Sequence, residues 1–228
     1  MFKKLSNIGD CGIVCDFGDE VNQKINSNVI KLFHHVRKQV LKENLKGILN
    51  YTPSYNKLII NFDLQKINSS TIIEFLESVD FSQLSFSQNK KEWEIPICYD
   101  FAMDLKNISK TLKIDENEII NIHLKTIFFI YMVGFIPGHP FMGDLDSKLF
   151  LNRLKTPRVK IPAGSIGIVE KFCNIYPYES PGGWHIIGRT PTKLFNTKDN
   201  SNPCLLSPGD IVKFKSISKK EFENLNNE

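Results

Sequence analysis

Apolar residues follow a helical period in one long segment near the start of the chain, and they alternate with polar residues in short segments around it. Segment 23–43 has apolar residues at spacings of three and four, which predicts an amphipathic helix. Segments 11–17, 48–53 and 57–63 are typical of β-strands, with a turn at residues 53–56 joining the last two. The helical stripe consists of Ile25, Val29, Phe33, Val36 and Val40.

A second, shorter helix is expected after Ser69 and Ser70, whose hydroxyls would cap it. The order strand, helix, strand, strand, helix makes up most of a ferredoxin-like α+β unit. The polar segment 82–92 is typical of a linker. We therefore predict an N-terminal α+β domain over residues 1–88 and a second domain over residues 89–228.

The second half of the chain changes from this alternating order to short strands between turns. Residues 93–100 predict a strand, and Asp115 is expected to open a helix, with Glu118 three residues later as in a capping box. Residues 128–135 are expected to leave that helix as a buried strand. Further strands are predicted over 165–169, 184–189 and 211–215, each directly after a glycine-containing turn. Repeated turns and strands at this spacing favour a β-barrel or sandwich.

Composition excludes several classes of function. The 29 lysines and arginines exceed the 25 acidic residues by four, and the lysines are scattered, which argues against nucleic acid as a partner. The longest apolar run is too short for a membrane span and the N-terminus lacks an apolar signal segment, so we expect a cytoplasmic protein. Five cysteines without a CxxC pair favour reduced thiols over disulfides or a metal site.

Three blocks dense in glycine and proline lie between residues 134 and 191. They are GFIPGHPFMGDLD (134–146), PRVKIPAGSIGIV (157–169) and IYPYESPGGWHIIGRTP (175–191). Because Gly and Pro fix the backbone in opposite ways, such blocks favour either a rigid pocket or the tight turns of a compact barrel. The spacing alone favours turns, and both interpretations stay open.

Four residues are candidates for catalysis. His123 lies on the apolar stripe of its helix, so it is either a packed core histidine or a side chain that faces a pocket. His139 is held between prolines in the PGHP segment. Arg158 and Arg189 adjoin rigid turns, where a guanidinium either grips a carboxylate or phosphate or bonds to loop carbonyls.

Candidate substrate-binding residues come from the same three blocks. Ser165 and Ser180 have little support as nucleophiles, because no GxSxG pattern surrounds them. The chain also lacks a Walker-type loop and a GxGxxG motif, so it does not itself predict a nucleotide site. The candidates are Pro137, Gly138, Ser165, Glu179, Ser180, Gly182, Gly183 and Trp184.

The three blocks, with the later SPGDIVKF, closely resemble the allophanate hydrolase subunit 1 family, which includes the B subunit of 5-oxoprolinase and the kinase inhibitor KipI. The similarity extends over almost the whole chain, through IGDCGIVCDFGDEVNQKINSNV and TPSYNKLIINFD near the start and IPICYD at the domain junction. The resemblance implies an N-terminal α+β domain followed by a cyclophilin-like β-barrel. Two departures stand out: the family commonly has Phe at His139, and the polar residues QTG at positions 172–174.

The resemblance also implies that the chain works as part of a complex. The expected partners are the C subunit of 5-oxoprolinase, which is of the allophanate hydrolase subunit 2 type, and the A subunit of the same enzyme. That complex opens the lactam of 5-oxoproline to glutamate with ATP hydrolysis, and the ATP need not contact this chain. Catalysis would use His123, His139, Arg158 and Arg189 on one face of a pocket shared with a partner, together with backbone amides of the PAGS and PGG turns.

Two other functions are compatible with the same family. The chain is either half of a biotin-dependent carboxyltransferase, as in urea amidolyase, or a KipI-like inhibitor of a histidine kinase. Glutamate release from 5-oxoproline by the purified complex distinguishes the first function from both.

Overall fold

The computed structural model describes residues 2–84, 91–199 and 201–226. The chain divides into two compact units, Met1–Asn89 and Lys90–Glu228, each with its own hydrophobic core. Most of the predicted linker, residues 85–90, lies outside the described residues. Within the described part of the chain, no helix has the length and apolar character that crossing a bilayer requires.

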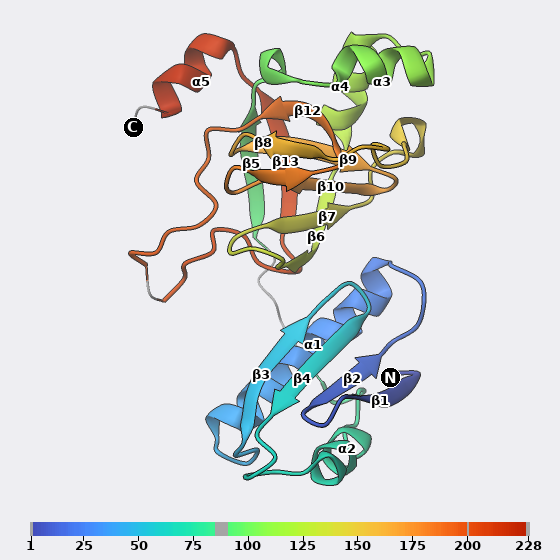
Figure 1. The fold of residues 1–228 in the computed structure, drawn as a ribbon, viewed down its shortest axis with the longest axis vertical. Coiled ribbons are helices and arrows are strands. Elements are labelled where there is room, and N and C mark those ends of the chain that lie inside the picture. The colour runs from blue at the N-terminus through green and yellow to red at the C-terminus, as the bar shows by residue number, and fades with distance from the viewer. Residues whose placement is uncertain (1, 85–90, 200, 227–228) are drawn as a thin grey trace. The chain divides into compact units, whose positions relative to one another are not determined.

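The first unit is a four-stranded antiparallel sheet with two helices (Figure 1). The strand order in the sheet is β1-β2-β4-β3. Helix α1 connects β2 to β3, and β4 lies between these two strands. The predicted strands and both helices are present, and β1 was missed because KLSNI lacks apolar alternation. The elements are β1 Lys4–Ile8, β2 Gly12–Asp16, α1 Gln23–Leu41, β3 Ile48–Pro53, β4 Lys57–Phe62 and α2 Ser69–Glu77.

Asparagines, not serines, begin both helices of this unit. Asn22 caps α1 by accepting a hydrogen bond from the Ile25 amide. Asn68 caps α2 by accepting one from the Thr71 amide, so the prediction that Ser69 and Ser70 act as caps is wrong. An Asx side chain one residue earlier has an oxygen placed to satisfy the free amides of the first turn, and Ser69 is then the first residue within the helix.

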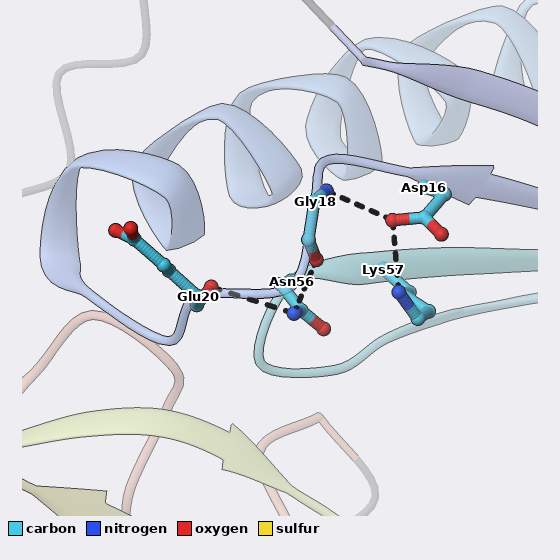
Figure 2. Close-up of polar contacts among 5 residues, drawn as sticks. All are labelled: Asp16, Gly18, Glu20, Asn56 and Lys57. Carbon is cyan, nitrogen blue, oxygen red and sulfur yellow. Dashed lines mark hydrogen bonds and ion pairs between the residues drawn. The ribbon is translucent and has the colours of Figure 1, made fainter.

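A polar network fixes the loop between β2 and α1 against the β3–β4 turn (Figure 2). The Asp16 carboxylate accepts hydrogen bonds from the Gly18 amide at 2.8 Å and from the Lys57 ammonium at 2.8 Å. The Asn56 side chain donates to the carbonyls of Gly18 and Glu20. The Lys57 contact and the Gly18 amide hold the pKa of Asp16 below its usual range.

The second unit is built on a seven-stranded sheet of order β12-β9-β10-β7-β6-β13-β5, with β8 and β11 as a separate pair. The prediction of a mixed chain with a barrel-like second half is confirmed. Its strands are β5 Glu92–Ile97, β6 Phe128–Val133, β7 Pro140–Gly143, β8 Arg158–Ile161, β9 Ser165–Val169, β10 Phe172–Ile175, β11 Ser180–Gly182, β12 His185–Arg189 and β13 Ile211–Ser216. Its helices are α3 Leu105–Leu112, α4 Glu116–Lys125 and α5 Lys219–Asn226, with 3-10 turns at Tyr99–Phe101 and Ser147–Leu149.

The two edges of this sheet meet at one bridge, which nearly closes it into a barrel. Cys98, just after β5, pairs with Arg189, the last residue of β12. The Cys98 amide donates to the Arg189 carbonyl at 2.8 Å, and the Arg189 amide donates back at 3.0 Å. Asp115 caps α4 as predicted, accepting from the Asn117 amide. Helix α3 was missed because DLKNISKTL carries few apolar residues.

Candidate functional site

Side chains from the glycine- and proline-rich blocks converge around Tyr176, on the segment that follows β10. His139, just before β7, packs against the Tyr176 ring with centroids 5.3 Å apart. Gly167 of β9 lies close enough that a Cβ there would come within 3.3 Å of the same ring. Trp184, just before β12, is only 9% exposed and packs edge-on against Phe141. The blocks therefore form one cluster as well as a set of turns.

His139 is the most enclosed polar group of this cluster. Its side chain is 3% exposed and stacks on Phe141 with centroids 4.5 Å apart. Ring atom Nε2 lies 3.0 Å from the Asn174 amide nitrogen, while Nδ1 is buried with no hydrogen-bond partner among the described residues. Burial lowers the pKa of His139 to about 4, so the ring is neutral at physiological pH.

The hydroxyl of Tyr176 marks the other side of the cluster. Burial raises its pKa, and hydrogen bonds from the Asn174 side chain and the Trp184 backbone, together with the charges of Arg153 and Arg158, oppose that rise. A Cβ at Gly182 would collide with this hydroxyl. Tyr176 therefore connects the His139 ring on one side with a cationic region on the other.

Arg158 is anchored by a carboxylate that the sequence analysis did not single out. Asp104 is 2% exposed, and its Oδ1 accepts a hydrogen bond from one terminal nitrogen of Arg158. Its Oδ2 accepts a second hydrogen bond from the Ile186 amide at 2.6 Å. The second terminal nitrogen of Arg158, Nη1, is buried and has no partner within the described ranges. A guanidinium held on one edge with a free nitrogen on the other is arranged to bind an anion.

The segment between the second 3-10 turn and β8 adds positive charge beside this arginine. Residues 150–160 contain Arg153, Lys155, Arg158 and Lys160. The Leu154 amide donates to the Gly183 carbonyl at 2.9 Å, which ties this segment to the PGG turn. The Arg153 side chain lies near Gly183, since a Cβ there would come within 3.7 Å of Nε.

The structure places His123 in the core of the barrel. Its side chain is fully buried, Nδ1 lies 2.7 Å from the Tyr99 hydroxyl and Nε2 lies 3.9 Å from the Cys173 sulfur. The ring also stacks on Phe214. Both nitrogens have partners, so of the two interpretations that the sequence left open, the packed core histidine describes the geometry.

Arg189 lies at the seam of the barrel instead of beside His139. Its Nε donates to the Ala163 carbonyl at 2.6 Å. Its guanidinium lies over the rings of Phe101 and Phe222, at 5.9 and 5.5 Å. The structure thus favours the role in which this arginine bonds a loop carbonyl.

The structure places the eight predicted binding residues in different parts of the second unit. Gly182 and Trp184 contact the Tyr176 hydroxyl, and Gly183 lies near Arg153 and Pro157. Pro137 and Gly138 form the turn that carries His139. Ser165 is buried within β9, while Glu179 is exposed and paired with Lys160 at 3.0 Å. Ser180 lies in β11 opposite Ile161, on the strand pair outside the barrel sheet.

Sequence reasoning missed Asp104, Phe141, Asn174 and Tyr176 as members of the candidate site. Phe141 and Tyr176 lie inside the glycine- and proline-rich blocks, so their position in those blocks was an available signal. Asp104 precedes a helix in DFAMDL, and nothing local to it indicates that it pairs with a residue 54 positions later.

Three open hollows of about 500 to 670 Å³ lie elsewhere on the described surface of the second unit. One lies between α4 and residues 144–148, one beside residues 193–205, and one between the first 3-10 turn and α4. None of the three is lined by a predicted site residue, so their size alone does not identify the site.

The two buried histidines predict a loss of stability in acid. Burial lowers the pKa of His123 to about 3 and that of His139 to about 4, whereas an unfolded histidine titrates at about 6.5. Between these values the unfolded chain binds protons that the folded chain does not. We therefore expect the free energy of unfolding to fall from pH 7.5 to pH 5, by about 2 kcal/mol for each histidine.

Tryptophan fluorescence during denaturant titration measures this loss, because both tryptophans, Trp93 and Trp184, lie in the second unit. In the variant His139→Phe the decrease should be smaller by about 2 kcal/mol, the contribution of one histidine. A decrease of the same size in the variant would contradict the assignment of His139 as a buried neutral group.

The chain belongs to the family described as carboxyltransferase domain, subdomain C and D, whose model matches residues 3–206. It is 32% identical over 232 residues to the B subunit of 5-oxoprolinase from Bacillus subtilis strain 168, with 96% of this chain and 95% of that protein covered. The predicted resemblance to the group that contains allophanate hydrolase subunit 1 and this 5-oxoprolinase component is thereby confirmed.

Two further similar proteins are longer than this chain. Urea amidolyase of Lachancea kluyveri is 23% identical over 248 residues, which cover 94% of this chain and 13% of that protein. The solved structure of the protein TTHA0988 superposes with a TM-score of 0.78 at 26% identity, covering 91% of this chain and 40% of that one. The chain therefore corresponds to 13% and 40% of these two proteins and to 95% of the Bacillus protein.

Proposed function

We propose that this chain is the B subunit of a heteromeric 5-oxoprolinase, which opens 5-oxoproline to glutamate with ATP hydrolysis. The observation that carries the proposal is the match along nearly the full length of a protein named as the B component of 5-oxoprolinase. The carboxyltransferase alternative fits less well, because identity to urea amidolyase is lower and the chain spans 13% of that enzyme.

The finer description of the fold belongs to the same proposal. The first unit is a ferredoxin-like domain. In the usual order a strand that follows the second helix forms one edge of the sheet, and here β1 forms that edge. Its β2–α1–β3 connection around β4 supports this description. The second unit is a cyclophilin-like barrel, supported by the seven-stranded sheet that one bridge nearly closes.

The cluster around Tyr176 is the substrate site in this proposal. 5-Oxoproline carries a carboxylate and a cyclic amide, and the cluster has a cationic side and a side with a neutral imidazole. The Nη1 atom of Arg158, with Arg153 beside it, binds the carboxylate, and His139 faces the amide. Hydrogen bonds between an arginine and a carboxylate are charge-assisted and orient the ligand as well as holding it.

Completion of the site requires other proteins of the complex. His139 is 3% exposed in the isolated chain, and the neighbouring Phe135 is 87% exposed. The C and A subunits of 5-oxoprolinase are the proposed partners, and an exposed aromatic ring beside a buried polar group is suited to contact one of them. ATP is used by the complex, and no part of its binding is assigned to this chain, which has no Walker-type loop.

Reconstitution tests this function directly. The chain is co-expressed with its A and C partner proteins, the complex is purified, and glutamate release from 5-oxoproline is measured with and without ATP. We expect release that needs ATP and all three chains. A complex that instead carboxylates urea with a biotin carrier, or a lone chain that blocks kinase autophosphorylation, would overturn the proposal.

An exposed arginine offers a test of the cationic side. Replacing Arg153 with glutamine removes charge near the Tyr176 hydroxyl without burying an unpaired group, so KM for 5-oxoproline should rise by about tenfold with kcat little changed. The matched control is Lys148→Gln, an exposed cation on the second 3-10 turn. Equal KM values for the two variants would remove Arg153 from the binding site.

A further inference from the structure

Helix α1 carries a row of lysines outside the stripe that it buries. Its apolar stripe packs into the core of the first unit, against one face of the four-stranded sheet (Figure 1). Lys24, Lys31 and Lys38 follow one another at spacings of seven residues, and Lys42 at the C-cap comes four residues later. Seven residues are nearly two helical turns, so the first three lysines share one face over about 21 Å. Lys31 is half-buried and the other three members of this lysine row are exposed.

The charge of the lysine row is not compensated by the described part of the chain. Segment 23–41, which forms α1, contains no acidic residue. None of the four lysines makes an ion pair with another described residue, whereas Lys46, Lys57 and Lys66 of the same unit each pair with a carboxylate. The row therefore presents four unpaired positive charges along one line.

Helix stability does not explain this arrangement. Lys24 lies near the N-terminal end of α1, where the partial positive charge of the helix repels a cation, and no acidic residue of the first turn offsets it. Burial and, as a second cause, the charge of Lys38 lower the pKa of His35, which lies on the same face as the row. Lys38 is favourably placed in the last turn, so the helix dipole accounts for one end of the row and not for the other.

The spacing and the surroundings of the row determine which anionic partner fits it. A second helix with acidic residues seven apart repeats its charges every 10.5 Å or so, as the row does, and helices that pack side by side pair their charges in this way. Phosphates on one DNA strand follow at about 3.4 Å along the axis, so most of them would have no lysine opposite. A lipid surface requires apolar residues beside the cations, but Ser27 and Asn28, between Lys24 and Lys31, are polar.

We propose that the lysine row docks an acidic helix of a partner protein, with carboxylates opposite Lys24, Lys31 and Lys38. The inference deepens the proposed function and rests on it, since the partners are the A and C proteins of the complex. It gives the first unit a role in assembly, separate from the candidate site in the second unit. Complementary charges of this kind accelerate association and fix the register of the two surfaces.

Charge reversal in the full chain tests the row. The native chain and the triple variant Lys24→Glu, Lys31→Glu and Lys38→Glu are titrated into the A and C proteins, and Kd is measured calorimetrically at low and high salt. We expect Kd of the triple variant to be higher by about tenfold to a hundredfold at low salt. Salt should weaken binding of the native chain more than binding of the variant. Equal Kd values with equal salt dependence would overturn the inference.

A second triple variant is the matched control for net charge. Lys106→Glu, Lys125→Glu and Lys220→Glu change the charge by the same amount, with one exposed lysine from each helix of the second unit. Its Kd should stay within about threefold of the native value, because these lysines form no row. A loss as large as that of the first variant would attribute the effect to net charge and contradict docking at α1.

The single variant Lys24→Glu separates binding from folding. An acidic residue in the first turn is favourable for the helix, so the midpoint of thermal unfolding should be equal to or above that of the native chain while Kd rises. A lower midpoint with unchanged Kd would contradict the proposed role of Lys24.

Two further outcomes identify what fails. If the native chain binds a DNA duplex, the triple variant does not, and both assemble equally with the A and C proteins, the assignment of the row to a protein partner is wrong. A native chain that binds neither protein would sink the proposed function and this inference together. Native assembly that the row variant leaves unchanged would sink the inference alone.

Discussion

Replacing Asp104 with alanine is expected to lower the free energy of unfolding of the second unit by about 3–5 kcal/mol. The substitution leaves the guanidinium of Arg158 and the amide of Ile186 without their acceptor, in a place where Asp104 itself is 2% exposed. A folded domain has a total stability of about 5–15 kcal/mol, so this loss is a large share. Tryptophan fluorescence during urea titration measures it.

An exposed ion pair on the same unit provides the matched control. Glu179 pairs with Lys160 at 3.0 Å, and both side chains are more than half exposed. Because water screens such pairs, Glu179→Ala should change the free energy of unfolding by about 0–1 kcal/mol. The double variant Asp104→Ala with Arg158→Met should be more stable than Asp104→Ala alone, since it removes the unpaired charge. A loss below that of Glu179→Ala would refute the buried pair as a major contributor.

Gly164→Ala is the second substitution with a large expected effect. Gly164 has a φ of 80°, and an added Cβ would collide with the carbonyl oxygen of Thr190. The Gly164 amide donates to the Tyr176 carbonyl at 2.7 Å, so displacement of this turn reaches the candidate site. We expect a loss of about 3 kcal/mol or more, the sum of the φ penalty and the backbone shift.

Gly9→Ala separates the two causes. Gly9 also has a positive φ, 55°, but nothing lies within 4 Å of an added Cβ. The free energy of unfolding of this variant should therefore fall only by the cost of the unfavourable φ, about 1–2 kcal/mol. Circular dichroism during unfolding of the first unit measures this loss. If the two variants lose the same free energy, the close approach of Gly164 to Thr190 is not what requires glycine there.

Strands with strong apolar alternation were predictable from the sequence, because their side chains satisfy one local pattern. β9 was predicted at its observed bounds, and β4 and β12 within one residue. β1 was not, since its pattern is mostly polar and its place in the sheet comes from pairing with β2. Helix starts were less predictable where two capping residues adjoin, as at Asn68 and Ser69.

The site was predictable as a region and not as a set of roles. The glycine- and proline-rich blocks identified where His139 and the PGG turn lie, because rigid backbone leaves a local signature. Whether a histidine is enclosed in a core, as His123 is, depends on side chains brought from other elements, such as Tyr99 and Cys173. The partner of Arg158 is likewise determined by tertiary packing, 54 residues away along the chain.

The pairing of β5 with β13 makes the second unit able to fold later than the first during translation. The last strand of the first unit ends at Phe62 and its last helix at Glu77, so the elements of that unit are complete before the strands of the second unit are made. β5 ends at Ile97, but its parallel neighbour spans Ile211–Ser216. A nascent chain thus carries β5 as an unpaired strand until residues 211–216 have been made, and chaperones that shield exposed strands would act on this segment.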